Sequence, residues 1–300
     1  MFPNFTALPW VTAYGVFLIT SLALWWWLAR SQAKRAGLDC SHIDLLAPLI
    51  ILGGILGAKL FSIISPDDIQ VSGDQYLVTG RLRLFGWILM GLVVLAVYCR
   101  ITRLSFLKAA DVFAAPSLLA IGIGRIGCFM GGCCWGDVCA SSSQLAALSD
   151  SALHAQIHTF AWVSGEHNPL AIQFPAGSFV HQQHLVCGLL NEGSARSLPV
   201  HPVQLYESVL VLGLFPAVWF GFRTNSIPGR ACLAAMASYS IVRFLIEFFR
   251  ADNSIVLHGL TFTQLICLVT LILSALLWVI IGKRGMEVSN NLNSLPTSQT

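Results

Sequence analysis

Long uncharged apolar segments recur along the chain and restrict what it can fold into. The first 29 residues contain no Asp, Glu, Lys or Arg, and this run ends only at Arg30. A helix needs about 20 apolar residues to cross a lipid bilayer, with about 17 as the lower limit. These segments therefore predict a membrane protein that crosses the bilayer several times. Further apolar runs cover residues 43–65, 84–99, 111–128, 203–222, 229–248 and 258–281.

The expected fold is an all-α polytopic membrane protein with about seven transmembrane helices. Residues 8–29 are counted as a retained first span, because no Lys or Arg precedes the apolar run as it would in a signal peptide. Residues 1–284 are predicted to form a single integral-membrane domain, and 129–201 a long extracytoplasmic insertion. The polar residues 285–300 are predicted to form a disordered cytoplasmic tail.

The composition excludes several classes of protein. The chain is 56% hydrophobic and 10% charged, whereas soluble domains carry roughly 25% charged residues. Its net charge of +3 comes from only 17 Lys and Arg against 14 Asp and Glu. That is too sparse for a surface that binds nucleic-acid phosphates. A cytosolic enzyme, a nucleic-acid-binding protein and a disordered scaffold are excluded.

Basic residues in the short connections predict the orientation in the membrane. Cytoplasmic loops carry an excess of Lys and Arg, and here they follow the first, third, fifth and seventh spans. This alternation predicts an N-terminus outside and a C-terminus in the cytoplasm. The basic residues concerned are Arg30, Lys34, Arg35, Arg100, Arg103, Lys108, Arg223, Arg230, Lys283 and Arg284.

A stripe of polar residues marks the sixth span. Tyr239, Arg243, Glu247 and Arg250 are spaced by four, four and three residues, which places them on one helical face. Ionisable groups inside a membrane are costly and by default mark a functional site. The alternative is that an Arg243–Glu247 pair only fixes helix packing.

A second candidate is Arg125, which lies in a glycine-rich stretch that includes Gly124 and Gly127. Glycines let backbones approach closely and expose N–H groups, and a guanidinium offers a planar set of donors suited to a phosphate. We therefore expect a phospholipid headgroup to bind here. The alternative is an arginine that extends from the end of a span towards water.

The start of the fifth span carries His201 and Glu207, for which a substrate role and a packing role both remain open. Asp44 and Asp111, at the cytoplasmic ends of two spans, are interpreted as structural because a helix N-terminus favours an acid.

Four cysteines cluster after the fourth span. On the predicted topology they face an oxidising compartment, where a disulfide would persist. A zinc site is a second interpretation, although the chain has no Cys-x-x-Cys pair here. The third is a reactive thiol whose ionisation a nearby arginine would favour. The four residues are Cys128, Cys133, Cys134 and Cys139.

Three blocks of the sequence resemble the prolipoprotein diacylglyceryl transferases, enzymes of the bacterial cytoplasmic (inner) membrane. They are residues 124–136, 201–207 and 239–250, and Tyr14 with Gly15 adds to the likeness. The resemblance implies transfer of the diacylglyceryl group from phosphatidylglycerol to the thiol of a lipobox cysteine, with release of glycerol phosphate. It implies phosphatidylglycerol, membrane lipids and prolipoprotein signal peptides as partners.

Roles for individual residues follow from the same resemblance. Arg125 is implied to hold the phospholipid headgroup, and Arg243 to be the essential intramembrane arginine with Glu247 as its acid. Tyr239 is implied to line the cavity. We expect a monomer that needs no cofactor and no metal. The remaining residues implied at the phospholipid site are Tyr14, Gly124, Gly127 and Arg250.

The chain also departs from the family pattern. Cys128 and Cys133 stand where the family has an Asn and a Glu, and residues 85–88 lack the His of a His-Gly-Gly motif. The group that activates the acceptor thiol is therefore open, with Cys128, Cys133, His201 and Glu207 as candidates. Two alternative functions remain: a phospholipid-binding protein without transferase activity, and a related transferase that uses a cysteine nucleophile.

Overall fold

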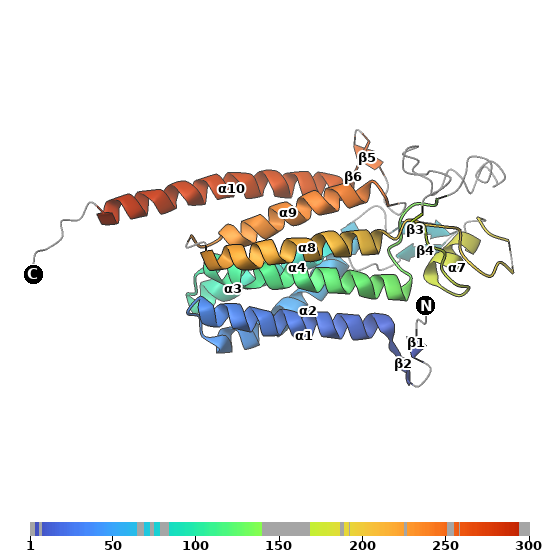
Figure 1. Cartoon of the computed structure of the whole chain (residues 1–300), viewed down its shortest axis with the longest axis horizontal. Helices are drawn as coiled ribbons and strands as arrows, with labels where there is room; N and C mark the ends of the chain where they lie inside the picture. The colour runs from blue at the N-terminus through green and yellow to red at the C-terminus, as the bar shows by residue number, and fades with distance from the viewer. Residues whose placement is uncertain are drawn as a thin grey trace, which may run out of the picture. The chain divides into compact units, whose positions relative to one another are not determined.

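Helices form most of the computed structural model, and Figure 1 labels them. The helices are α1 (Ala13–Arg35), α2 (Cys40–Ile64), α3 (Leu84–Thr102), α4 (Phe106–Gly131), α7 (Phe179–Val186), α8 (Val203–Thr224), α9 (Arg230–Glu247) and α10 (Phe262–Asn293). The structure describes residues 4–5, 8–64, 69–72, 75–78, 84–139, 169–186, 189–191, 193–224, 227–250, 255–257 and 259–293.

The strands are short and form antiparallel hairpins of two strands each. None of them builds a larger sheet within the described ranges, so the all-α prediction is confirmed. The pairs are β1 (Asn4–Phe5) with β2 (Leu8–Thr12), β3 (Ile69–Ser72) with β4 (Gln75–Val78), and β5 (Ile255–Leu257) with β6 (Leu260–Thr261).

Each of the seven predicted spans contains a helix. Among the described residues, five helices are long and apolar enough to cross a membrane, namely α1, α2, α4, α8 and α10. The apolar part of α3 is shorter, covering Gly86–Thr102. Helix α9 has 18 residues and includes Arg230, Arg243 and Glu247, which lower its hydropathy. The chain is a multi-pass membrane protein.

Several predicted boundaries were wrong. The first helix begins at Ala13 instead of residue 8, because Leu8–Thr12 form β2. The Thr12 hydroxyl accepts a hydrogen bond of 3.0 Å from the N–H of Gly15, which caps the helix. At the other end α10 continues past residue 284 to Asn293, since the residues there include no proline to stop a helix. Residues 294–300 lie outside the described residues.

The predicted extracytoplasmic insertion contains ordered structure. Helix α4 extends into it as far as Gly131, and α7 lies within it. Residues 136–139 are held by backbone hydrogen bonds to the carbonyls of Pro199, His201 and Phe249. Residues 140–168 lie outside the described residues. A small apolar core supports the segment and consists of Val138, Phe174, Val180 and Val200.

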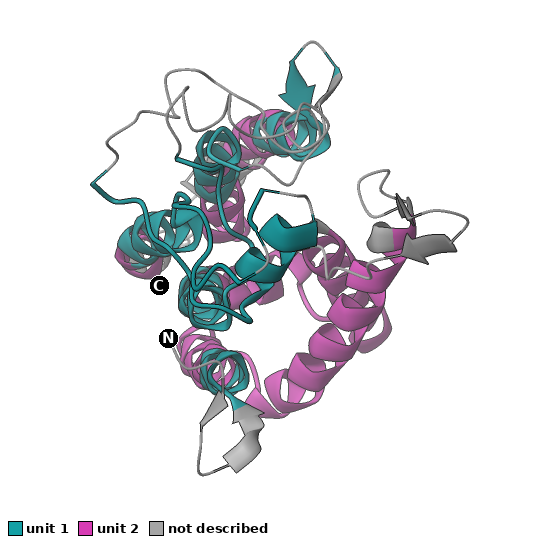
Figure 2. Cartoon of the chain, turned by 90° about the vertical axis from the view of Figure 1, so that its right-hand side faces the viewer, with its two compact units in different colours: residues 1–23, 118–215, 238–271 teal, residues 24–117, 216–237, 272–300 magenta. Residues whose placement is uncertain are grey.

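Figure 2 divides the chain into two compact units, whose boundary falls within α1, α4, α8, α9 and α10. The first unit holds residues 1–23, 118–215 and 238–271, and it contains every residue predicted for the functional site. The second unit holds residues 24–117, 216–237 and 272–300.

The two acids interpreted as structural make structural contacts in the second unit. Asp111 accepts hydrogen bonds from the backbone N–H groups of Gly229 at 2.6 Å and Cys232 at 2.7 Å, at the start of α9. Asp44 forms a 3.0 Å ion pair with Arg30. The contacts therefore support a structural role, but a different one from that expected: Asp111 holds the start of α9, and Asp44 pairs with a residue of α1.

Glycines let α2 and α3 pack closely in the second unit. A Cβ placed at Gly53 would lie 2.5 Å from the side chain of Val94. A Cβ at Gly57 would collide with the carbonyl oxygen of Gly86 and with Cβ of Met90. Small residues at such interfaces allow the backbones of membrane helices to approach.

We predict that Gly57→Ala lowers the thermal stability of the detergent-solubilised protein. The new methyl group meets backbone at Gly86, which cannot rotate away, so the expected loss is about 1–3 kcal/mol. Unfolding can be followed by tryptophan fluorescence. The control is Gly213→Ala in α8, where a Cβ would have nothing within 4 Å. Equal melting temperatures for the two variants would show that close packing at Gly57 is not needed.

Candidate active site

A buried carboxylate connects three helices of the first unit. Glu207 of α8 forms a 3.0 Å ion pair with Nε of Arg125 on α4, and the hydroxyl of Tyr239 on α9 donates to it at 3.1 Å. The Glu207 side chain is 1% exposed and that of Arg125 is 12% exposed. Glu207 is therefore the partner of Arg125, and it is not a free base for a thiol.

A second ion pair lies within α9. Nη2 of Arg243 is 2.7 Å from Oε2 of Glu247, one helical turn along. The hydroxyl of Thr261 donates to the other oxygen of Glu247 at 2.8 Å. The structure therefore contains the pair on which the packing interpretation of the stripe rests.

The position of Thr261 is itself fixed by the start of α10. The Thr261 hydroxyl accepts from the N–H of Gln264 at 3.2 Å, and the Gln264 side chain accepts from the N–H of Thr261 at 2.9 Å. This reciprocal pair is a capping box. It orients the hydroxyl that contacts Glu247. The Thr-x-x-Gln spacing is visible in the sequence, so this contact could have been found there.

Arg243 keeps one donor available. Its side chain is 8% exposed, and Nη1 is buried without a hydrogen-bond partner among the described residues. A buried guanidinium donor without a partner is costly. An anionic ligand would supply the acceptor that this donor lacks.

The polar stripe of α9 faces inward as predicted. Tyr239, Arg243 and Glu247 are buried, whereas Ile241 and Leu245 are exposed. The stripe is shorter than predicted, because α9 ends at Glu247.

Arg250 follows α9 in a tight turn, in which its N–H bonds the carbonyl of Glu247 at 3.2 Å. Its positive charge still favours the ionised form of Glu207, as do the charges of Arg125 and Arg243.

Residues of the predicted phospholipid site lie along α1 and α4. Tyr14 packs on α4, with its Cδ2 3.5 Å from a Cβ placed at Gly127 and its Cβ 3.5 Å from one placed at Gly131. A Cβ at Gly124 would have nothing within 4 Å. Gly127 thus permits helix packing, while Gly124 borders open space one turn away.

His201 lies in an aromatic cluster. Its ring is 5.6 Å from that of Phe249 and 6.2 Å from that of Tyr206, between ring centroids. Its Nδ1 is 3.4 Å from the hydroxyl of Tyr206. These contacts favour the packing interpretation of this histidine.

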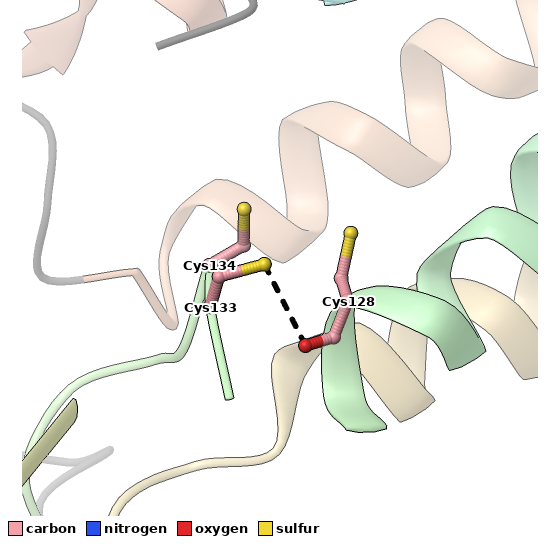
Figure 3. Close-up of side chains that lie close together, drawn as sticks. All are labelled: Cys128, Cys133 and Cys134. Atoms are coloured by element: carbon pink, nitrogen blue, oxygen red, sulfur yellow. Dashed lines mark hydrogen bonds between the residues drawn. The ribbon is translucent and has the colours of Figure 1, made fainter. Parts of the chain in front are cut away.

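The clustered cysteines form no disulfide. Cys128, Cys133 and Cys134 carry free thiols, and Cys139 is not bonded to another described cysteine. The structure therefore does not contain the disulfide that one of the three interpretations expected. Instead, the sulfur atoms of Cys128, Cys133 and Cys134 all lie within 4.8 Å of one another. Figure 3 draws these three side chains.

The sequence is similar to a known protein family along nearly its whole length. Residues 4–280 match the family described as prolipoprotein diacylglyceryl transferase. Relatives named phosphatidylglycerol–prolipoprotein diacylglyceryl transferase include the following three. That of Clostridium tetani is 25% identical over 272 residues, 88% of this chain and 90% of the relative. That of Symbiobacterium thermophilum is 28% identical over 284 residues, which are 91% of this chain and 90% of the relative. That of Rhodopirellula baltica is 29% identical over 188 residues, 60% of this chain but only 33% of the relative.

One acid near the site lies outside the membrane-spanning helices. Asp137 is buried, and its carboxylate accepts a hydrogen bond of 2.7 Å from the N–H of Val138. Burial raises the pKa of Asp137 to about 6, and the hydrogen bond offsets this only in part. The folded protein therefore favours the protonated acid more than the unfolded chain does.

We predict that wild-type protein loses stability relative to Asp137→Asn as the pH rises from about 4 to above 6. Across that interval the unfolded chain has released a proton that the folded protein retains, so the free energy of unfolding falls by up to about 3 kcal/mol. The difference between the two melting temperatures, measured against pH, checks this. A difference independent of pH would contradict it.

Proposed function

The chain belongs to the prolipoprotein diacylglyceryl transferase family, and we propose that Arg125 and Arg243 bind the phosphate of phosphatidylglycerol while its diacylglyceryl group passes to a prolipoprotein cysteine. The observation that carries this proposal is the buried Nη1 of Arg243, which has no hydrogen-bond partner among the residues that the structure describes. A phosphate oxygen supplies the acceptor that this donor lacks.

The charges of the site fit a phosphodiester. Three arginines act on Glu207, namely Arg125, Arg243 and Arg250, while Glu207 and Glu247 are the two acids in the ion pairs. Phosphatidylglycerol carries one negative charge on its phosphate, which these arginines attract.

The reaction is a displacement at carbon. The acceptor sulfur attacks the glycerol carbon that bears the phosphate ester, the C–O bond breaks and a C–S bond forms. Glycerol phosphate leaves with additional negative charge. Arg125 and Arg243 stabilise that charge in an environment of low dielectric constant, where fixed donors act strongly. Glu247 orients Arg243, and Glu207 with Tyr239 orients Arg125.

The location follows from the same proposal. The enzyme lies in the bacterial inner membrane as a monomer, with its N-terminus outside and its C-terminus in the cytoplasm. The residues of the site then lie near the outer surface, where secreted prolipoproteins arrive. The distribution of Lys and Arg among the short loops supports this orientation.

We predict that Arg243→Ala reduces diacylglyceryl transfer by about 100–1000-fold, the usual cost of one donor to a developing charge. Purified protein in detergent is incubated with phosphatidylglycerol and a lipobox peptide, and mass spectrometry detects the thioether product. Arg30→Ala is the matched control, because it also removes an arginine from an ion pair but in the second unit. Full activity of Arg243→Ala would contradict the proposed role.

A companion variant addresses Arg125. Arg125→Ala alone leaves Glu207 buried without its cation, which destabilises a protein by about 3–5 kcal/mol. Arg125→Gln combined with Glu207→Gln removes both charges and keeps polar side chains at both positions. We expect the double variant to fold and to lack transferase activity. A folded double variant with wild-type turnover would show that Arg125 does not act on the phosphate.

A further inference from the structure

A cluster of three thiols lies at the outer end of α4 and is not used by the mechanism above. Figure 3 shows the side chains of Cys128, Cys133 and Cys134 in the first unit. Their sulfur atoms lie within 4.8 Å of one another. Cys128 belongs to the last turn of α4, and the other two follow the helix.

The backbone brings these residues together. The N–H of Cys133 bonds the carbonyl of Cys128 at 3.1 Å, the N–H of Gly132 bonds that of Phe129 at 3.1 Å, and Gly132 has a φ of 66°. This is a Schellman motif, which brings the second residue after the helix, Cys133, against Cys128, three residues before the last residue of the helix. Both residues here are cysteines.

Further contacts hold the segment in place. The amide of Gln204 donates to the carbonyl of Cys133 at 2.6 Å. Cys134 has a φ of 58°, in the left-handed region that residues with a side chain rarely adopt. A strained backbone of this kind is typical of functional sites. The three sulfurs are therefore preorganised by their surroundings.

The separations suit a thiophilic metal ion. Zinc binds thiolate sulfur at about 2.3 Å, which in a tetrahedron places the sulfurs about 3.8 Å apart. Small side-chain rotations bring three sulfurs that lie within 4.8 Å of one another to that spacing. Three protein ligands with a fourth position open are the usual arrangement of a catalytic zinc.

The proposed reaction needs a group that activates the acceptor thiol. Glu207 is held by Arg125 and Tyr239, and Glu247 by Arg243 and Thr261. Residues 85–88, where the resemblance places a histidine, contain none. A zinc ion deprotonates a thiol that it binds, and so replaces a base.

We propose that Cys128, Cys133 and Cys134 bind Zn²⁺, and that the acceptor cysteine of the prolipoprotein occupies the fourth position. This inference rests on the proposed function. Gly124 and Cys128 lie four residues apart on one face of α4, and a Cβ at Gly124 would have nothing within 4 Å. Open space for an acceptor therefore lies one turn from the thiols.

The step balances without a redox change. The acceptor thiol gives its proton to solvent on binding zinc. Its sulfur then supplies the electron pair for the new C–S bond, and the C–O bond pair leaves with glycerol phosphate. The neutral thioether is a weaker ligand than the thiolate, so the product dissociates from the metal.

We predict that the purified full-length protein binds one zinc ion and that Cys133→Ser loses both the metal and at least about 100-fold of the transfer rate. Elemental analysis after dialysis measures the metal, and the peptide assay measures transfer. Cys139→Ala is the matched control, because it removes a cysteine of the same segment outside the cluster. It should keep both zinc and activity.

Cobalt tests the fourth position. Co²⁺ loaded into the chelator-treated protein should show the sulfur-to-metal absorption of a thiolate site, and a lipobox peptide should intensify it. A peptide with Ser in place of Cys should leave it unchanged. An identical spectrum with both peptides would overturn the fourth-ligand assignment.

The outcomes separate the two proposals. Full transfer activity in a metal-free protein, or in Cys133→Ser, would overturn the zinc site and leave the transferase intact. Zinc that is lost on dialysis against micromolar chelator, or a disulfide between two of the three cysteines in active protein, would also overturn it. Tight zinc binding without transfer of lipid to any lipobox peptide would instead contradict the proposed function.

Discussion

Burial of Glu207 is the constraint on which the rest of the site depends. A carboxylate that is 1% exposed must recover in the protein the interactions it loses in water, and a missing partner would leave an uncompensated charge. Arg125 and Tyr239 supply those interactions from α4 and α9. The carboxylate of α8 therefore ties together the end of α4 and the middle of α9, and with them it fixes the position of the Arg125 guanidinium.

The ion pair between Arg243 and Glu247 is also buried, but one donor of Arg243 has no partner among the described residues. Arg243 could be fully satisfied by another acid or a carbonyl, as most buried arginines are. Its Nη1 has no partner among the described residues, while the capping box of α10 uses Thr261 to hold Glu247. In a site that served stability alone, Nη1 of Arg243 would be hydrogen-bonded to a protein acceptor. Leaving it open costs stability and provides a place for an anion, which is the usual relation between function and strain.

The sequence predicted the features that depend on local spacing. Apolar runs located the helices, and the four-residue separation of Arg243 and Glu247 predicted their pairing. It did not predict the pairing of Arg125 with Glu207, because residues so far apart in sequence meet only through helix packing. Helix ends were missed where competing structure forms, as when Leu8–Thr12 became a strand. The closeness of Cys128 and Cys133 could have been predicted from the sequence, because Cys128, Gly132 and Cys133 have the spacing of a Schellman motif.

Helix α4 joins the two halves of the chemistry. Arg125 and Cys128 lie three residues apart, which corresponds to a rise of about 4.5 Å and neighbouring positions on one face. In a displacement at carbon the nucleophile and the leaving group lie on opposite sides of the reacting atom. Because one helix carries both Arg125 and Cys128, it would keep the proposed phosphate site and the proposed thiol site at a constant spacing.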